Sequence, residues 1–353
     1  MKLTEIQKYV SQMVSDRTSI SLYLVLKEQA EDKSVKYVKY LANVDSDDGT
    51  TDSLKKMFAD YLKERILDDS ELNTSGLEDL PGLSSSDEVS GRIYAYDYPL
   101  EDIPESLVLF RDYYARKVNR LSYDLNKEPK FDFNKHNLSN LTGFIIHLSV
   151  DKVNCVLYKK AYNINILKRD KFLYVFGQDN RFKRAEGDFL KLDGKVELLK
   201  IDNEIFVLDV KTLEGQLGLS QLISKDAEKG LKHIEELGIV KNFDDLKLHS
   251  EDNLALKKKL AKISRVSPVV TKKISKDAII NFAMGKDTLK DRFKFEDGQI
   301  QLTKSSIPAF LNLMNDAYLT SELTKEFYEA HAKDRMVKAE RVKQWSAMQN
   351  MYF

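Results

Sequence analysis

A short group of charged side chains with catalytic potential follows the apolar stretch of residues 205–208. Asp209 and Lys211 follow this stretch, and Asp202 lies seven residues upstream of Asp209. Carboxylates at a strand end can hold Mg²⁺, and a neighbouring lysine can help to activate water. Asp202 (or Asp193), Asp209 and Lys211 are therefore the catalytic candidates of one hypothesis, a metal-dependent nuclease of the PD-(D/E)xK type.

Two observations weaken the nuclease hypothesis. Asp202 is only one hairpin turn away from Asp209, and charged residues commonly follow an apolar strand by chance. No histidine lies three or four residues from another histidine or cysteine, so the sequence predicts no zinc site. The favoured expectation is a protein with no catalytic residue, no metal and no cofactor.

A second set of candidate residues is basic and points to nucleic acid. Residues 256–276 contain eight lysines and arginines and no acid, and on a helical wheel the bases of the first half oppose its leucines and isoleucine. Such a stripe neutralises phosphates without reading sequence, although a solvated helix face is the alternative. The predicted nucleic-acid-binding residues are Lys257, Lys258, Lys262, Arg265, Lys272, Lys273 and Lys276.

Charge also gathers in three other regions. Residues 68–106 hold eleven acids and a single base, Arg92. A secondary basic cluster lies among aromatic residues that could stack on bases, and it comprises Lys168, Arg169, Lys171, Arg181, Lys183 and Arg184. A third basic cluster alternates with acids in a way typical of ion pairing along a surface helix, and it comprises Lys333, Arg335, Lys338, Arg341 and Lys343.

The elements that must position these residues centre on residues 143–209. Period-2 alternation there predicts about six short strands in an antiparallel meander, a curved or partly closed sheet. Helical periodicity follows, with helices expected over 250–266 and 323–345. The predicted fold class is α+β, with an N-terminal mixed α/β unit at 1–130 and a second domain at 131–353 that joins the β-meander (141–214) to a helical C-terminal region.

Composition places the chain among well-packed proteins of a reducing compartment. The 353 residues are 42% hydrophobic and 32% charged, with 56 basic and 56 acidic side chains. That length suggests roughly two domains. The single cysteine, Cys155, excludes an internal disulfide, and the sequence shows no apolar run of the length that spans a membrane.

The order of several segments resembles a known family. The carrying segments are Phe-Asp-Phe at 131–133, Leu-Ser-Asn-Leu-Thr-Gly-Phe-Ile-Ile at 138–146, Val-Leu-Tyr-Lys at 156–159, Ile-Phe-Val-Leu-Asp-Val-Lys-Thr-Leu-Glu at 205–214, and Ser-Ser-Ile-Pro at 305–308. With this order the chain resembles the KwaB-like family of the Kiwa anti-phage defence system. The resemblance implies a bacterial cytoplasmic protein that binds DNA and works with a small multi-span membrane partner. It carries over no catalytic residue.

The functional expectation joins this resemblance to the charge pattern. We expect an anti-phage defence effector that contacts DNA phosphates without sequence specificity. It would lie in the cytoplasm, peripheral to the inner membrane through its partner, and form a homodimer, the commonest closed assembly. A metal-dependent nuclease and a protein-interaction scaffold are the alternatives.

Overall fold

The largest element of the fold is an antiparallel sheet. The computed structural model describes residues 1–69, 72, 79–84, 92–113, 128–151, 153–163, 166–167, 175–178, 181–184 and 189–330. Within them the sheet has seven strands. In order across the sheet they are β2 (Val35–Leu41), β1 (Ser19–Gln29), β4 (Leu141–Val150), β5 (Val153–Lys160), β10 (Leu198–Ile201), β11 (Glu204–Val207) and β3 (Tyr94–Ala95).

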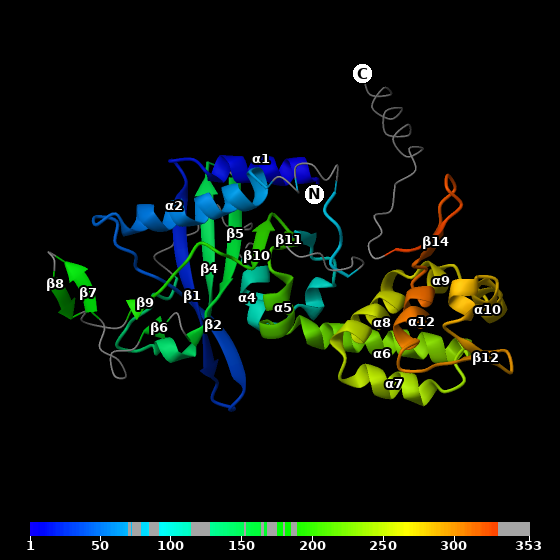
Figure 1. Ribbon diagram of the computed structural model, residues 1–353. Helices are drawn as coiled ribbons and strands as arrows, with labels where there is room; N and C mark the ends of the chain where they lie inside the picture. Colours follow the sequence, from blue (N-terminus) through cyan, green and yellow to red (C-terminus); the bar gives the residue numbers. More distant parts are fainter. Residues whose placement is uncertain are drawn as a thin grey trace, which may run out of the picture.

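Both faces of the sheet are buried under helices (Figure 1). The helix α1 (Leu3–Met13) packs Ile6 and Val10 against one face, together with α2 (Thr50–Leu62). The opposite face carries Tyr23 and Tyr158 and is covered by α4 (Val108–Arg111), α5 (Val210–Gln216) and the start of α6 (Leu219–Leu237). Side chains of a strand alternate between the two faces of the sheet. Because both faces are buried here, the strands are apolar at nearly every position. Short 3₁₀ or π turns lie at Lys63–Leu67, Leu100–Asp102, Glu105–Leu107 and Leu138–Asn140.

The expected α+β class with a central antiparallel sheet is confirmed, but the sheet is not closed. It ends at two edge strands, β2 and β3. β1 pairs with both β2 and β4, so the N-terminal hairpin extends the same sheet as the meander. The predicted domain boundary near residue 130 therefore falls between strands of one sheet.

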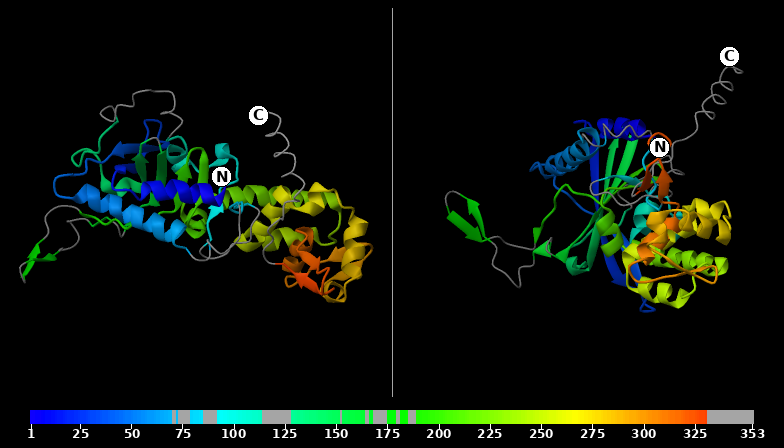
Figure 2. Two further views of the ribbon diagram at one scale, coloured as in Figure 1. Left: turned by 90° about the horizontal axis from the view of Figure 1, so that it is seen from above. Right: turned by 45° about the vertical axis from the view of Figure 1, so that its right-hand side comes forward.

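Residues between β5 and β10 do not add strands to the large sheet, contrary to the expected meander. β6 (Ile166–Leu167) pairs with β9 (Phe189–Leu190), and β7 (Val175–Gln178) pairs with β8 (Arg181–Arg184), as two separate two-stranded sheets. The physical reason is that β5 has β4 on one side and β10 on the other, which leaves no edge for the intervening strands. In Figures 1 and 2 the β7–β8 hairpin stands well away from the large sheet.

The chain after β11 forms a helical unit with its own core. Its elements after α6 are α7 (Phe243–Glu251), α8 (Leu254–Val266), α9 (Pro268–Thr271), α10 (Lys276–Met284), α11 (Asp287–Lys290) and α12 (Ile307–Met314), with hairpins β12–β13 (Lys294–Glu296 and Gln299–Gln301) and β14–β15 (Tyr318–Thr320 and Phe327–Glu329). None of the helices among these described residues is long and apolar enough to cross a lipid bilayer.

Two helix predictions in this unit differ from the structure. The helix expected over 250–266 is present but begins at Leu254, because the Asn253 side chain accepts a hydrogen bond from the amide of Leu256 at 3.1 Å and caps its start. The helix expected from residue 323 does not begin there, because Phe327–Glu329 pairs with Tyr318–Thr320 as a hairpin. The remainder of that expectation, residues 331–345, lies outside the described residues.

Helix α6 belongs to both cores and joins the two units (Figure 1). Its first turns pack Leu219 and Ile223 against the sheet, and its later turns pack Ala227 and Ile234 into the helical unit. At Gly230 the helix α8 approaches so closely that an added Cβ would lie 2.1 Å from the carbonyl oxygen of Leu260. A side chain at this position would force the two helices apart.

We predict that Gly230→Ala destabilises the protein. Alanine would favour an isolated helix by about 1 kcal/mol. The clash is with a backbone oxygen that cannot rotate away, so we expect a net loss of about 1–3 kcal/mol, measured as the urea midpoint of unfolding. Gly215→Ala in α5 is the matched control, because its added Cβ meets nothing within 4 Å. An unchanged midpoint for Gly230→Ala would disprove the close contact.

Candidate functional site

A pocket lies at the seam between the sheet and the helical unit. It has a volume of about 270 Å³ and is bounded by the β3 region, α5, the start of α6, and α8. We call it the seam pocket. Its lining residues are Leu83, Ser84, Tyr94, Tyr98, Val210, Glu214, Leu219, Ile223, Ala255, Lys258, Lys259 and Lys262.

Three lysines from two successive turns of α8 line the seam pocket. Lys258 is held by Glu214 of α5, with 2.6 Å between its Nζ and the carboxylate Oε1. Lys259 donates to the side-chain oxygen of Asn312. Three ammonium groups and one carboxylate give the lining a net charge of two positive (3 − 1). The pocket is therefore a cationic recess with apolar walls.

The basic face of α8 contacts the sheet unit instead of lying open along the surface. Arg265 donates its Nε proton to Asp226 of α6 at 2.5 Å, and its guanidinium carbon lies 4.1 Å from the ring centroid of Tyr98. Burial alone would raise the pKa of Asp226, but hydrogen bonds from Lys229 and Arg265 outweigh burial and lower that pKa. Arg265 is thus committed to holding α8 against α6 and the sheet.

The other predicted nucleic-acid-binding residues occupy two different places. Lys257 lies beside an open hollow whose lining includes Glu228 and two further acids. Lys272 and Lys273 are exposed on the turn between α9 and α10, and half-buried Lys276 begins α10. We call the last three the turn lysines. The structure therefore divides the predicted basic residues into three groups. Lys258 and Lys262 line the seam pocket, Arg265 is ion-paired with Asp226, and Lys257 and the turn lysines lie elsewhere.

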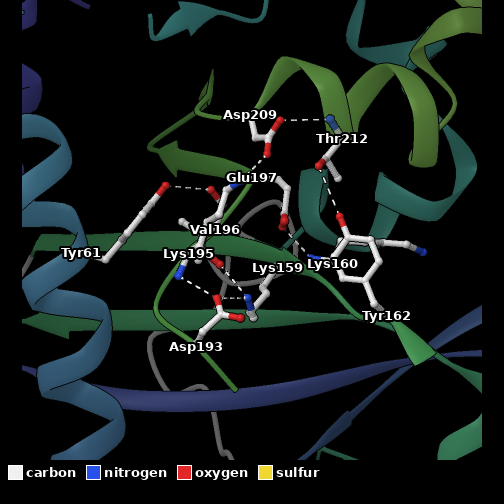
Figure 3. A network of polar contacts seen from close by, with 10 residues as sticks. All are labelled: Tyr61, Lys159, Lys160, Tyr162, Asp193, Lys195, Val196, Glu197, Asp209 and Thr212. Atoms are coloured by element: carbon white, nitrogen blue, oxygen red, sulfur yellow. Dashed lines mark hydrogen bonds and ion pairs between the residues drawn. The ribbon is translucent and has the colours of Figure 1, made fainter. Parts of the chain in front are cut away.

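Near the N-terminus of α5, a network of charged side chains connects that helix to the sheet (Figure 3). Asp209 caps α5 by accepting from the amide of Thr212 at 3.0 Å, and Lys195 Nζ lies 2.8 Å from its Oδ2. Lys195 also donates its amide proton to Asp193 at 3.0 Å, and buried Lys159 pairs with the same carboxylate at 2.6 Å. Asp193 and Asp209 are thus each paired with a lysine ammonium group, which is a structural pattern.

Glu197 is the buried carboxyl of this network and is 3% exposed. Burial raises its pKa to about 7, nearby Asp209 adds to the rise, and a hydrogen bond from the amide of Lys160 opposes it. For Asp209, burial works in the same direction, but hydrogen bonds from Lys195 and the Thr212 amide prevail and lower its pKa. The two carboxyls therefore differ in protonation near neutral pH.

The structure does not bring the three nuclease candidates together. Asp202 is in the turn of the β10–β11 hairpin, where it accepts a hydrogen bond from Tyr9 at 3.1 Å, while Asp209 follows the far end of β11. Seven residues of extended chain separate them by roughly 20 Å. Lys211 is exposed on α5. Within the part of the chain that the structure describes, no group of three or more metal-type side chains is arranged to hold an ion.

The secondary basic cluster is only partly described. Lys168, Arg169 and Lys171 lie outside the described residues, as does the third cluster from Lys333 to Lys343. Arg181, Lys183 and Arg184 are strand residues of β8, in the hairpin that stands apart from the large sheet (Figure 2). Because three of the four residues of β8 are basic, nucleic-acid contact by this hairpin stays a prediction.

Sequence reasoning missed the third pocket lysine and the buried charges. Lys259 lies between the predicted residues Lys258 and Lys262, but its position on the helical wheel does not distinguish it from lysines exposed to solvent. Glu197 directly precedes β10 and Lys200 lies within it, in an apolar stretch where charged residues are expected to be exposed, yet both are 3% exposed. Burial lowers the pKa of Lys200 to about 8, and its ammonium donates to the carbonyl of Arg111. Only the helices packed on the sheet make these charges internal.

Comparison with known proteins gives one family and one curated relative. The family model described as Kiwa protein KwaB-like matches residues 138–324, from the start of β4 region through the helical unit. The Kiwa protein KwaB of Escherichia coli O55:H7 (strain RM12579 / EPEC) is 30% identical over 289 residues, which cover 80% of this chain and 86% of the relative. No solved structure matches the chain significantly.

We predict that Glu197 makes stability fall as pH rises towards neutral. A carboxyl whose pKa is about 7 in the folded protein and about 4.3 in the unfolded chain favours folding fully below the lower value. That contribution, roughly 4 kcal/mol, is lost as pH rises through the higher value. Glu197→Gln should therefore gain stability relative to the parent protein between pH 5 and 8, as measured by urea unfolding.

The matched control for this titration is Glu31→Gln, which removes an exposed carboxyl from the same unit. Its stability should follow the parent protein at every pH. If the stability difference between Glu197→Gln and the parent protein is the same at every pH, the Glu197 carboxyl is not the group that titrates.

Proposed function

This chain belongs to the Kiwa protein KwaB-like family, and on that premise we propose that it is a Kiwa anti-phage defence protein that contacts DNA and works with a membrane partner. Family membership supports the defence role. The DNA contact and the partner rest on the charge arrangement and are our proposal.

The observation that carries DNA contact is the cluster of turn lysines. Lys272, Lys273 and Lys276 fall within five consecutive residues, and no ion pair found among the described residues involves them. Lys276 is at the first position of α10, where the helix dipole disfavours a cation, so helix stability does not account for it. Exposed ammonium groups gathered in this way suit backbone phosphates, which they would contact without reading bases.

The membrane partner is proposed from charge and from the family. Acidic residues at Asp68, Glu101 and Glu105 belong to the acid-rich region and are described at or near the surface. Such a region is repelled by anionic lipid headgroups but suits the basic cytoplasmic loops of a membrane protein. We propose attachment through a small multi-span partner, not through lipid, with a homodimer as the assembling form.

We predict that Lys272→Gln/Lys273→Gln weakens binding to duplex DNA. If both lysines contact phosphates, the slope of log K against log salt should flatten by roughly 1.8, at about 0.9 for each contact. The measurement is a fluorescence anisotropy titration at several salt concentrations. Lys290→Gln/Lys304→Gln removes two exposed lysines from the same unit and is the control for net charge.

Equal affinity and salt slope in the double variant and the parent protein would contradict contact through the turn lysines. Intact DNA after incubation with Mg²⁺ is expected in the same samples, and metal-dependent cleavage would favour the nuclease alternative. No DNA affinity, combined with capture of an acidic protein partner, would favour the scaffold alternative.

We predict that membrane attachment requires the partner. Expressed alone, the protein should remain in the supernatant after ultracentrifugation, and co-expressed with the membrane gene beside it, it should sediment with membranes. Liposomes of anionic lipid without protein should not bind it, because the acid-rich region opposes their surface potential. Strong binding to those liposomes would overturn attachment through a partner.

A further inference from the structure

The seam pocket has a size and lining that the proposed duplex contact does not use. Its volume of about 270 Å³ is close to the lower end of small-molecule sites, about 300–1,000 Å³. A duplex cannot enter a recess of this size, whereas a single nucleotide unit is comparable to it. Pockets between packed units are also preferred places for small ligands.

The chemistry of the lining is divided between charge and apolar surface. Lys258, Lys259 and Lys262 contribute three lysine side chains from one helix face, with Lys258 also bonded to Glu214 and Lys259 to Asn312. Glu214 is the one carboxylate among the described lining residues, and its ion pair with Lys258 at 2.6 Å reduces its repulsion of an anion. A lysine has three donors, so Lys258 can hold Glu214 and still bind a phosphoryl oxygen.

The remaining walls suit a planar apolar group. Tyr94 and Tyr98 come from the β3 region, and Leu219 and Ile223 come from the start of α6. The Arg265 guanidinium stacks on the Tyr98 ring and fixes its position. Ser84 is fixed as well, because its amide and hydroxyl donate to the Asp97 carboxylate at 2.8 and 2.6 Å. Tyr94 and Tyr98 are 1% and 7% exposed, so a nucleobase would contact a small part of each ring together with the aliphatic side chains.

We propose that the seam pocket binds one nucleotide, with its phosphoryl group on the three lysines of α8 and its base against the tyrosine and aliphatic wall. The ligand is either a free nucleotide or the phosphorylated end of a DNA strand, since both present the same chemistry. Because α8 and the sheet unit each supply one wall, the bound nucleotide stabilises the seam. The site is independent of the turn lysines.

The test is calorimetric binding to the full chain, with thermal unfolding as a second readout. The probes are AMP, dAMP and ATP, with adenosine and inorganic phosphate as partial ligands, and a single-stranded oligonucleotide with and without a 5′-phosphate. We expect at least one nucleotide or the phosphorylated oligonucleotide to bind and to raise Tm, and both partial ligands to bind at least tenfold more weakly. Preference for the phosphorylated oligonucleotide identifies a strand end, and preference for a mononucleotide identifies a free ligand.

Two variants test the pocket in different ways. Lys262→Gln removes one ammonium group and should lower affinity roughly ten- to hundredfold, the usual effect of losing a charged hydrogen bond. Ala255→Phe starts from an exposed position on the lining and should block the pocket without changing charge. Lys290→Gln/Lys304→Gln, which lies outside both proposed sites, is the control and should bind nucleotide as the parent protein does.

The outcomes separate this proposal from the DNA proposal. Loss of nucleotide binding in the pocket variants with duplex affinity retained supports the seam pocket. The proposal is overturned if no probe binds, if phosphate alone binds as well as nucleotide, or if folded Lys262→Gln and Ala255→Phe both bind like the parent protein. If the protein does not bind duplex DNA, the nucleotide-binding results still test the seam-pocket proposal.

Discussion

The close crossing of α6 and α8 at Gly230 is the contact on which the relation between the two units depends. The absence of a side chain there lets the carbonyl of Leu260 approach the α6 backbone. Since α6 contributes apolar residues to the sheet core and to the helical core, its position fixes both units. The Asp226–Arg265 pair at 2.5 Å lies near the same crossing and adds a buried polar contact. The seam pocket exists because this crossing brings α8 beside α5 and the β3 region.

Charge inside the sheet unit has a structural role of the same kind. Lys159, Glu197 and Lys200 are each almost fully buried. A buried charge is costly unless it is hydrogen-bonded or neutralised. Lys159 has the Asp193 carboxylate, Lys200 has a backbone carbonyl, and Glu197 has a raised pKa that favours its neutral form. The same network holds the N-terminus of α5 through Asp209, so it positions the helix that supplies Glu214 to the pocket.

The basic segment 256–276 thus contributes lysines to two different surfaces. The pocket lysines of α8 line the seam between the two units, while the turn lysines lie beyond α9 on the outside. In the proposed function the outer lysines contact a long polyanion, and the pocket lysines hold a single phosphoryl group. A family role in Kiwa defence is compatible with both proposed contacts. A protein that binds nucleic acid without reading its sequence gains specificity when a second site recognises a particular nucleotide or strand end.

The sequence by itself determined the local structure and the chemical types. Alternation in β1 and β4, the stop of α6 at Gly238 and the hairpin across Asp297 follow from nearest neighbours along the chain. Long-range packing decided the rest. It placed Asp202 and Asp209 at opposite ends of a hairpin, turned the basic face of α8 inward, and buried Glu197. A hydrophobic pattern specifies that a helix has a packed face, but a charged face can meet solvent or another unit, and only the crossing at Gly230 determines which.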